Sequence, residues 1–531
     1  MLGSRLNFET IDLARFKRCT TNDDSSIRRD FCFNATVIEF SGNAWNDLQS
    51  FTSVSAAETT CIALAPGSAR TSSSGAAYGL VAASLLFWLA SVAVFLIHSP
   101  DELPLYFANR YLVLDPTSLL FVLVINTVFL GISVYMLSRE RTSTLFAQDI
   151  RFRAAMTVVF MVLMNVGILS NHLILMWALI ELSTLCAAPL VARGNSPSPK
   201  PTAWRYMLYS AMTLAITFLG FMCLSQSADL RGIEINFQVD QLSASLTTVK
   251  DGWQRLGLAF VLFGLGGKLG LAPLYSWMPE TYERAPTSTS ALLAAVQYNI
   301  SVVAVFRVLQ VFHGFEMGFV AQELLVMGYL SLIVAAVQIM AVRNYKRLVA
   351  YACVSSSGVI ALGLSVGGAA AYGVVLYIVS NAFVKSLLFL TSGRMWAVYG
   401  TNEVAPLNGV IRVMPFTGLL FTIGIFALLG FPPFASFLAE MLILSGIVQA
   451  GNLMAFTVMC GMLTIIFVST GRVIFPMLWD APTRTGPPVV ESLVTILPKL
   501  GFVSILIMLG TYAPEPVSQL LRAVAVSIGG V

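Results

Sequence analysis

The sequence predicts an all-α polytopic membrane protein. Of its 531 residues, 57% are hydrophobic and only 11% are charged, and the mean hydropathy is +0.79. An ordinary soluble domain carries about 25% charged residues. From Ala76 almost to the end, apolar runs follow one another at close to the ~20 residues that a helix needs to cross the hydrocarbon core. These observations predict about 13 to 14 transmembrane helices.

The chain divides into three parts by composition. Residues 1–75 are polar, mixed in charge and rich in Ser and Thr, and they lack the basic, apolar and small-residue regions of a secretory signal peptide. We expect a soluble or disordered N-terminal extension at 1–75, a transmembrane domain at 76–512 and a C-terminal tail at 513–531.

Two of the predicted spans are interrupted. The segment 411–449 contains Gly430-Phe431-Pro432-Pro433, and the segment 256–276 contains Pro273 and is followed by Pro279. Broken helices that each carry a buried charge are typical of transporters built from two inverted repeats. The thirteen predicted spans are 76–97, 116–137, 154–170, 172–192, 204–225, 256–276, 287–311, 320–341, 348–366, 370–391, 411–449, 454–476 and 493–512.

The basic residues predict the orientation in a cell (inner) membrane. Loops expected on one side are rich in Arg and Lys, whereas the opposite loops hold few, among them Arg110, Arg255 and Arg307. The positive-inside rule makes the basic side cytoplasmic, and the N-terminus then lies in the cytoplasm. The basic side holds Arg139, Arg141, Arg151, Arg153, Arg193, Lys200, Arg205, Arg343, Lys346, Arg347, Arg394, Arg412 and Arg484.

The composition argues against several kinds of site. Seven cysteines occur without any C-x-x-C pair, and there are only three histidines, so neither an iron–sulfur cluster nor a metal site is expected. The segment Gly267-Lys268 is not a phosphate loop, because Leu269 follows it where Ser or Thr is needed. The net charge of +4 lacks the clustered basic runs of a nucleic-acid binder. We therefore expect no metal, no cofactor and no nucleic-acid partner.

Ionisable residues inside apolar segments are the candidate functional groups. A charge at the centre of a membrane helix costs about 2.5–3.5 kcal/mol even on lenient scales. Such residues either form buried ion pairs or reach toward a helix end, or they relay protons, because burial and a nearby charge decide whether each one holds its proton. The four candidates are Glu181, Lys268, Lys385 and Glu440.

Longer stretches around these residues resemble a known family. LGGKLGLAPLYSWMPETYERAPTSTSALL (265–293), MWALIELSTL around Glu181, NYKRLVAYACVSSSG (344–358), NAFVKSLLFL (381–390) and GFPPFASFLAE (430–440) are similar to antiporter-like membrane subunits. Respiratory complex I (NADH:quinone oxidoreductase), Mrp-type cation/proton antiporters and group 4 hydrogenases share these subunits. The resemblance covers about 76–512 and is strongest to component F of hydrogenase-4.

The resemblance implies a proton-translocating, non-catalytic subunit of a redox-driven complex that has no cofactor of its own and assembles with other membrane subunits. Glu181 matches the essential glutamate of the family, Lys268 the lysine on the first broken helix, Lys385 the lysine that follows, and Glu440 the charge on the second broken helix. The alternative is a subunit of a Mrp-type sodium/proton antiporter or of a proton-coupled inorganic carbon transporter. A third reading is a degenerate subunit that only anchors a complex.

The sequence departs from the family at two points. Hydrogenase-type members usually carry histidines where this chain has Ser356, Tyr377 and Asn381, and these side chains order water but do not store a proton near neutral pH. The family normally has fourteen helices, and the missing one corresponds to the N-terminal extension. Because of the absent histidines, the proton relay at the centre of the subunit is the part of the family pattern that this sequence retains least.

Overall fold

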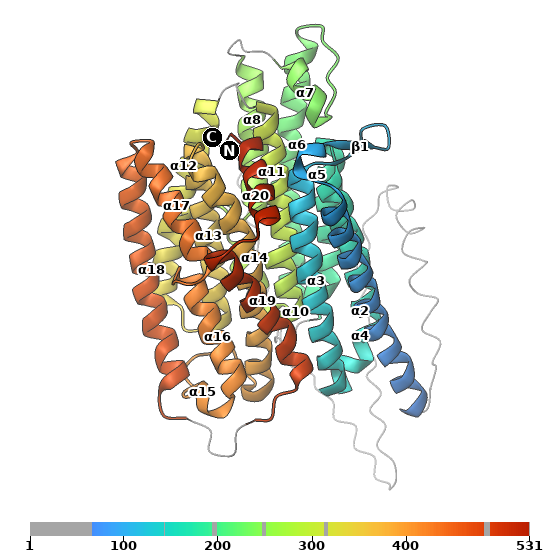
Figure 1. Cartoon of the computed structure of the whole chain (residues 1–531), viewed down its shortest axis with the longest axis vertical. Helices are drawn as coiled ribbons and strands as arrows, with labels where there is room; N and C mark the ends of the chain where they lie inside the picture. Colours follow the sequence, from blue (N-terminus) through green and yellow to red (C-terminus); the bar gives the residue numbers. More distant parts are fainter. Residues whose placement is uncertain are drawn as a thin grey trace, which may run out of the picture. The chain divides into compact units, whose positions relative to one another are not determined.

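The computed structural model describes residues 66–142, 144–193, 199–246, 251–312, 317–482 and 489–529. Within these ranges nearly all elements are helices, and the paired strands form one short hairpin (Figure 1). The predicted all-α fold is confirmed. Of the predicted extension, residues 1–65 lie outside the described residues, and the first helix begins at Pro66, before the predicted start at 76.

The elements are α2 (Pro66–Ile97), η1 (Pro100–Glu102), β1 (Leu105–Phe107), β2 (Leu112–Leu114), α3 (Pro116–Thr142), α4 (Thr144–Leu169), α5 (Leu173–Val191), α6 (Pro199–Asp229), α7 (Val239–Ser245), α8 (Gly252–Lys268), α9 (Trp277–Arg284), α10 (Thr287–Ala291), the π-helical turn η2 (Leu292–Gln297), α11 (Tyr298–Phe312), α12 (Met317–Ala341), α13 (Tyr345–Val366), α14 (Ala370–Tyr399), α15 (Val410–Val413), α16 (Pro415–Leu428), α17 (Ala435–Gln449), α18 (Leu453–Trp479), α19 (Leu493–Thr511) and α20 (Glu515–Ser527).

Eleven helices among the described residues are long and apolar enough to cross a membrane. They correspond to eleven of the thirteen predicted spans. The two remaining predictions, 256–276 and 411–449, are the segments that contain interruptions, and there the structure has shorter helices, α8 in the first and α16 and α17 in the second. The multi-span architecture is thus confirmed, while the total of 13 to 14 spans stays a prediction.

Both predicted breaks lie between helix halves. The first separates α8 from α9 and contains Pro273, whereas Pro279 lies inside α9 and interrupts nothing. Backbone polar groups at membrane depth need partners within the protein. The hydroxyl of Ser331 accepts from the backbone N–H of Ala272 at 2.8 Å, and the hydroxyl of Ser357 donates to the carbonyl of Leu269 at 2.8 Å. Side chains of neighbouring helices therefore satisfy the unwound backbone.

At the second break, as at the first, one long helix packs against both halves of the broken helix. This break separates α16 from α17 and contains Gly430, whose φ of +67° lies in the left-handed region. The helix α6 packs against both α8 and α9, and α14 packs against both α16 and α17. The short helix before α8 lies at the upper end in Figure 1, and the one before α16 lies at the lower end. The broken helices thus start from opposite ends, which supports the predicted inverted repeat.

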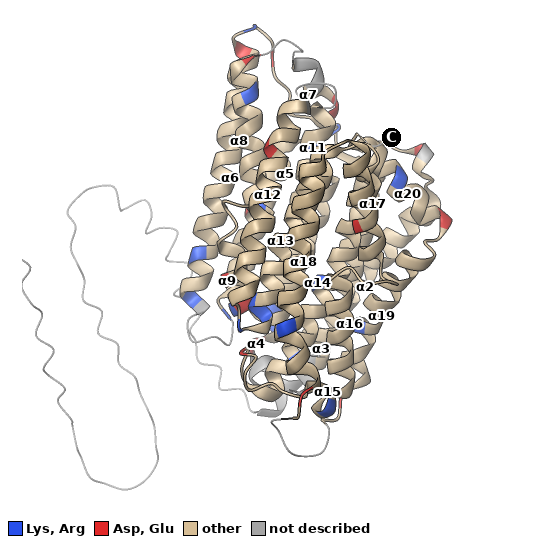
Figure 2. Cartoon of the chain, turned by 90° about the vertical axis from the view of Figure 1, so that its left-hand side faces the viewer, with Lys and Arg blue, Asp and Glu red and all other residues tan. Residues whose placement is uncertain are grey.

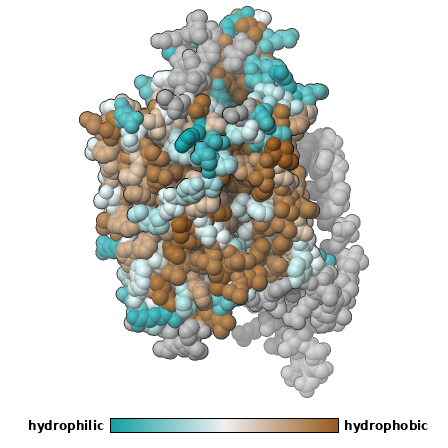
Figure 3. Space-filling model, viewed as in Figure 1, coloured by the Kyte–Doolittle hydropathy of each residue, from teal (hydrophilic) through white to brown (hydrophobic). Residues whose placement is uncertain are grey.

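The most buried helices form the centre of the bundle. The most apolar 18 residues of Thr287–Phe312 and of Ala370–Tyr399 are all buried, whereas only 17% and 22% of the corresponding residues of α2 and α18 are buried. Apolar side chains cover much of the middle of the visible face in Figure 3. Charged residues gather mainly toward the two ends, including a basic group beside α9 (Figure 2). This distribution suits a protein whose middle lies in hydrocarbon.

A buried ion pair joins α3 to α11 near the β-hairpin. Arg307 is 2% exposed, and its guanidinium donates to both carboxylate oxygens of Asp115 at 2.7 and 2.9 Å and to the hydroxyl of Ser118 at 2.8 Å. Burial alone would raise the pKa of Asp115, but the charge and hydrogen bonds of Arg307 outweigh it and lower the pKa. The placement of Arg307 in a loop was wrong, because the helix continues past it.

The predicted C-terminal tail contains an amphipathic helix. This helix, α20, packs against α14 and α3. The side-chain amide of Gln310, on α11, donates to the hydroxyl of Ser527 at 3.1 Å. The last helix therefore covers the end of the bundle where Asp115 and Arg307 meet.

We expect Arg307→Met to lower the free energy of unfolding by about 3–5 kcal/mol, because it leaves the buried carboxylate of Asp115 without its counter-charge. Because the pKa of Asp115 is lowered from 3.8 in the folded protein, the wild-type pair stabilises at neutral pH and loses its effect only as the pH falls through that lowered value. The unfolding midpoint in detergent measures the change.

Arg110→Met is the matched control. It removes an exposed arginine whose ion pair with Asp240 spans 2.8 Å, and exposed pairs contribute about 1 kcal/mol or less. Equal shifts in the unfolding midpoints of both variants would contradict a special role for the buried pair.

Candidate functional site

Lys268 is the last residue of α8, and it is only 2% exposed. Its ammonium group donates to the hydroxyl of Thr184, on α5, at 2.5 Å and to the hydroxyl of Ser210, on α6. The same ammonium lies 5.5 Å from the ring centroid of Tyr206 and 5.8 Å from that of Trp277. Oxygen lone pairs and aromatic faces from three elements thus stabilise the buried cation.

A glutamine extends this polar group toward the centre of the bundle. The side-chain amide of Gln297, in η2, donates to the hydroxyls of Ser183 and Thr184, each at 3.2 Å. Its carbonyl oxygen accepts from the hydroxyl of Tyr206 at 2.7 Å. The sequence analysis gave Gln297 no role, although an amide in the apolar run LLAAVQ is a signal for a buried polar partner.

Glu181 lies on α5, one helical turn before Thr184. The ammonium of Lys268 donates to Thr184 and Ser210 and not to Glu181, although the two side chains attract one another electrostatically. One carboxylate oxygen of Glu181 is buried and has no hydrogen-bond partner among the described residues. The neighbouring Leu182 and Leu185 are each 46% exposed. Glu181 therefore lies between the lysine and the outer surface of the subunit.

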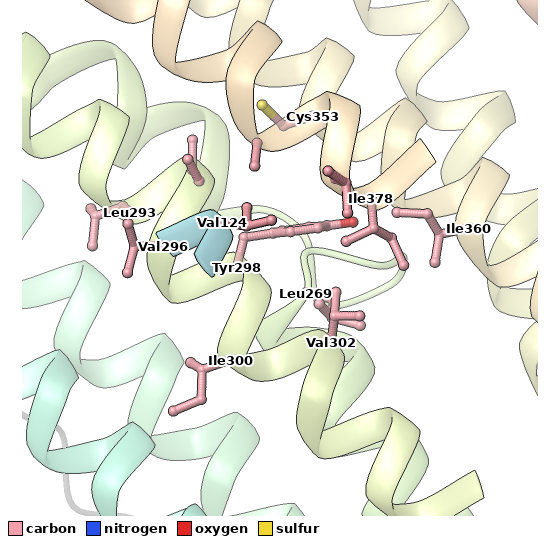
Figure 4. Packing of buried hydrophobic residues seen from close by; sticks show 14 of the residues in the cluster. Val124, Leu269, Leu293, Val296, Tyr298, Ile300, Val302, Cys353, Ile360 and Ile378 are labelled. Carbon is pink, nitrogen blue, oxygen red and sulfur yellow. The ribbon is translucent and has the colours of Figure 1, made fainter. Parts of the chain in front are cut away.

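A second polar chain leads from the first break to Lys385. The hydroxyl of Ser357, which donates to the carbonyl of Leu269, lies 3.1 Å from the hydroxyl of Tyr298. The ammonium of Lys385 is fully buried on α14 and lies 3.7 Å from the ring centroid of Tyr298. Figure 4 shows the Tyr298 ring among Leu269, Cys353 and Ile378. Tyr298 therefore contacts the next buried lysine directly and the break beside Lys268 through Ser357.

The three residues at the histidine positions lie together beyond Lys385. The hydroxyl of Ser356 donates to the side-chain oxygen of Asn381 at 3.1 Å, and the amide of Asn381 donates to the carbonyl of Tyr377 at 2.9 Å. Asn381 precedes Lys385 by one helical turn on α14. Polar side chains thus occupy this part of the bundle even though none is a histidine.

Glu440, on α17, borders a small cavity. The residue is 8% exposed, and the cavity has a volume of about 30 Å³, which is enough for a water molecule when polar partners are present. The hydroxyl of Thr470 is buried and has no hydrogen-bond partner among the described residues. The cavity is lined by Ala352, Ser355, Ser356, Tyr377, Leu428, Leu429, Glu440, Leu463, Ile466 and Thr470.

The sequence analysis missed several ionisable groups inside predicted spans or at their ends. Lys346 and Arg307 are each 2% exposed, Lys499 is fully buried, and one carboxylate oxygen of Glu323 is buried. The four candidates were therefore an incomplete set. The missed residues lie near helix ends, where the sequence alone does not separate a buried charge from one that reaches solvent.

No group of three or more His, Cys, Asp or Glu side chains in the described part of the chain could hold a metal ion. The polar side chains around Lys268, Lys385 and Glu440 are mostly hydroxyls and amides. They form a line of donors and acceptors that can hold protons or water between widely spaced ionisable groups.

Comparisons with known proteins assign the family. The model of the NADH:quinone oxidoreductase/Mrp antiporter transmembrane family matches residues 170–467. A hydrogenase-4 component F homolog from Methylacidiphilum infernorum is 25% identical over 424 residues, covering 77% of this chain and 87% of the relative. NADH-quinone oxidoreductase subunit N from Desulforudis audaxviator is 29% identical over 299 residues, covering 55% of this chain and 58% of the relative.

A chain from the solved Mrp complex of Dietzia sp. DQ12-45-1b shares the fold, with a TM-score of 0.76, 18% identity, and coverage of 87% of this chain and 93% of that chain. The family match includes both broken helices and all four candidate residues. The chain therefore belongs to the NADH:quinone oxidoreductase/Mrp antiporter transmembrane family.

Proposed function

We propose that the chain is a proton-translocating subunit of a redox-driven membrane complex of the hydrogenase-4 or NADH:quinone oxidoreductase type. The observation that carries this proposal is the buried polar line through the bundle. Its hydroxyl and amide groups lie between the region of Glu181 and Lys268, the buried Lys385, whose ammonium contacts the ring face of Tyr298, and the cavity beside Glu440. A protein that only anchored a complex would have no need to bury so many ionisable groups.

Lys268 is the proposed switch. Thr184 and Ser210 accept hydrogen bonds from its ammonium, and their hydroxyls can also donate to a neutral amine after a simple rotation. The proton affinity of the lysine then depends on the nearest charge. Because Glu181 attracts Lys268 while the ammonium donates to Thr184 and Ser210 instead, a movement of the carboxylate toward the lysine favours holding the proton, and a movement away favours releasing it.

The proposed proton route beyond Lys268 uses hydroxyl and amide groups, which can pass a proton but do not ionise near neutral pH. Ser357 and Tyr298 lead to Lys385, and Ser356 and Asn381 lead on toward Glu440. Hydroxyl and amide groups at these points can orient water or pass a proton without ionising. Proton storage in this half of the subunit then falls to Lys385 and Glu440, since histidines are missing there.

The proposed orientation places the N-terminus and the basic group beside α9 in the cytoplasm of a cell (inner) membrane. Its support is the positive-inside rule applied to the loops. The proposed partners are other membrane subunits, because the relatives are named as subunits of hydrogenase-4 and of NADH-quinone oxidoreductase. Exposed apolar side chains on α6, such as Trp204, Leu208 and Met222, offer a surface for lipid or for such a subunit.

A Mrp-type sodium/proton antiporter subunit is the second candidate, and the fold shared with the Mrp complex favours it. A proton-coupled inorganic carbon transporter belongs to the same class of alternative. The driving force separates the candidates. Redox turnover drives proton movement in a redox-driven complex. Proton movement is coupled to sodium movement in a Mrp-type antiporter and to bicarbonate uptake in an inorganic carbon transporter.

We expect Lys268→Ala and Glu181→Ala each to lower proton translocation per redox turnover by at least about tenfold, because each removes an ionisable group of the switch. Vesicles that contain the assembled complex, with proton movement and turnover recorded together, provide the measurement. Lys200→Ala removes an exposed lysine and serves as the control. Full proton stoichiometry in both Lys268→Ala and Glu181→Ala would favour the scaffold role instead.

We expect Gly430→Ala to impair proton translocation more than it impairs folding. A Cβ at Gly430 would clash with a carboxylate oxygen of Glu440, so the carboxylate has to leave its position at the cavity. Gly451→Ala is the matched control, since its φ of +73° gives the same backbone strain of roughly 1–2 kcal/mol without any atom within 4 Å. Equal translocation rates in the two variants would argue against a role for the Glu440 position.

A further inference from the structure

A lysine at the basic end of the bundle is buried, although its neighbours in the sequence are of the kind that lies at a protein surface. Lys346 follows Asn344 and precedes Arg347 at the start of α13. The side chain of Arg347 is 46% exposed, as a cation at a membrane surface should be. Lys346, in contrast, is 2% exposed and donates to the backbone carbonyl of Ala285, just after α9. Its ammonium is thus enclosed between α9 and α13.

A carboxylate on α9 accompanies this lysine. The side chain of Glu283 is 19% exposed, accepts from the side-chain amide of Asn344 at 3.0 Å and lies 3.7 Å from the guanidinium of Arg347. Asn344 also accepts from the backbone N–H groups of Lys346 and Arg347 at the start of α13. The amide therefore holds Glu283 at the same helix start that carries Lys346.

Glu283 follows the first break and lies outside the predicted span 256–276. Burial raises its pKa above the ordinary value of 4.5, and the attraction of Arg347, Arg284 and Lys346 only partly opposes this effect. The carboxyl group therefore takes up a proton more readily than an exposed glutamate does. The charged and titratable groups around it are Glu280 and Arg284 on α9, Arg205 on α6, Lys346, Arg347 and Tyr351 on α13, and Glu403 after α14.

The helices that carry this pair also pack against the helix that carries Lys385. Tyr282 precedes Glu283 on α9, is 1% exposed, and its ring centroid lies 5.7 Å from that of Phe389. Phe389 follows Lys385 by one helical turn on α14. The helix α13, which carries Lys346, packs against α14 as well.

We propose that Glu283 and Lys346 form a proton-uptake gate at the basic end of the bundle, an inference that rests on the proposed proton relay. Glu283 takes up a proton from water, and Lys346, enclosed between α9 and α13, exchanges a proton with the interior of the bundle. The gate uses both groups as titrating partners. A purely structural role would need only the positive charge of Lys346 and its hydrogen bond to Ala285.

Lys346→Arg separates the two roles, because arginine keeps the charge and the donors but does not release its proton. We expect proton translocation per complex to fall at least about tenfold in this variant, with the complex still assembled. Arg343→Lys, an exposed position three residues earlier, is the matched control and should leave the rate unchanged. Rates are compared at equal amounts of assembled complex in vesicles, so that a lower yield does not decide the outcome.

Glu283→Gln gives an independent readout, because glutamine can still accept from Asn344 but does not titrate. In the wild type, translocation should decline as the pH rises above the raised pKa of Glu283, and this limb of the pH profile should be missing in the variant. Wild-type rates and pH profiles in both Lys346→Arg and Glu283→Gln would overturn the gate while Lys268→Ala still abolishes translocation. Normal translocation in Lys268→Ala as well would instead overturn the proposed function.

Discussion

The rest of the structure depends on one constraint, which is that a polar group inside a membrane protein finds its partners within the chain. Helices satisfy this constraint for most of the backbone, and the first break satisfies it with the hydroxyls of Ser331 and Ser357. The same constraint governs the buried cations. Lys268 is held by two hydroxyls and two aromatic rings, and Lys385 lies over a third ring. Compared with a carboxylate, each of these hydroxyls and rings interacts only weakly with an ammonium group.

Weak partners have a functional value in this setting. A lysine in close contact with a carboxylate would be fixed in its charged form, whereas hydroxyls accept from an ammonium and donate to an amine. Around Lys268 the structure offers such two-way partners, whereas the ammonium of Lys385 lies over the ring of Tyr298 and has no hydrogen-bond partner among the described residues. Bidentate pairing joins Asp115 and Arg307 at the end of the bundle. The Asp115–Arg307 ion pair lies where α3 and α11 meet at the end of the bundle, whereas the more weakly bound Lys268 and Lys385 lie in its interior.

Local sequence was sufficient for eleven of the spans and for the two breaks, and it found four ionisable residues within apolar segments, because each of these features depends on the chemistry of a short stretch. The sequence did not indicate which side chains contact those charges. Thr184 and Ser210 meet Lys268 only because α5, α6 and α8 pack together, and nothing near Lys268 in the sequence indicates these hydroxyls. Lys346 was misjudged for a related reason, since its burial comes from α9 and not from its own neighbours in the chain.

The π-helical turn η2 has a mechanical consequence. Gln297, its last residue, hydrogen-bonds the hydroxyls around Lys268, and the next residue, Tyr298, lies over the ammonium of Lys385. Adjacent links of one backbone therefore contact two different buried lysines. A small rotation of this turn, of the kind that a π-to-α rearrangement produces, changes the surroundings of both ammonium groups in a single motion. The backbone of this turn therefore couples the surroundings of Lys268 to those of Lys385, in addition to any coupling between their charges.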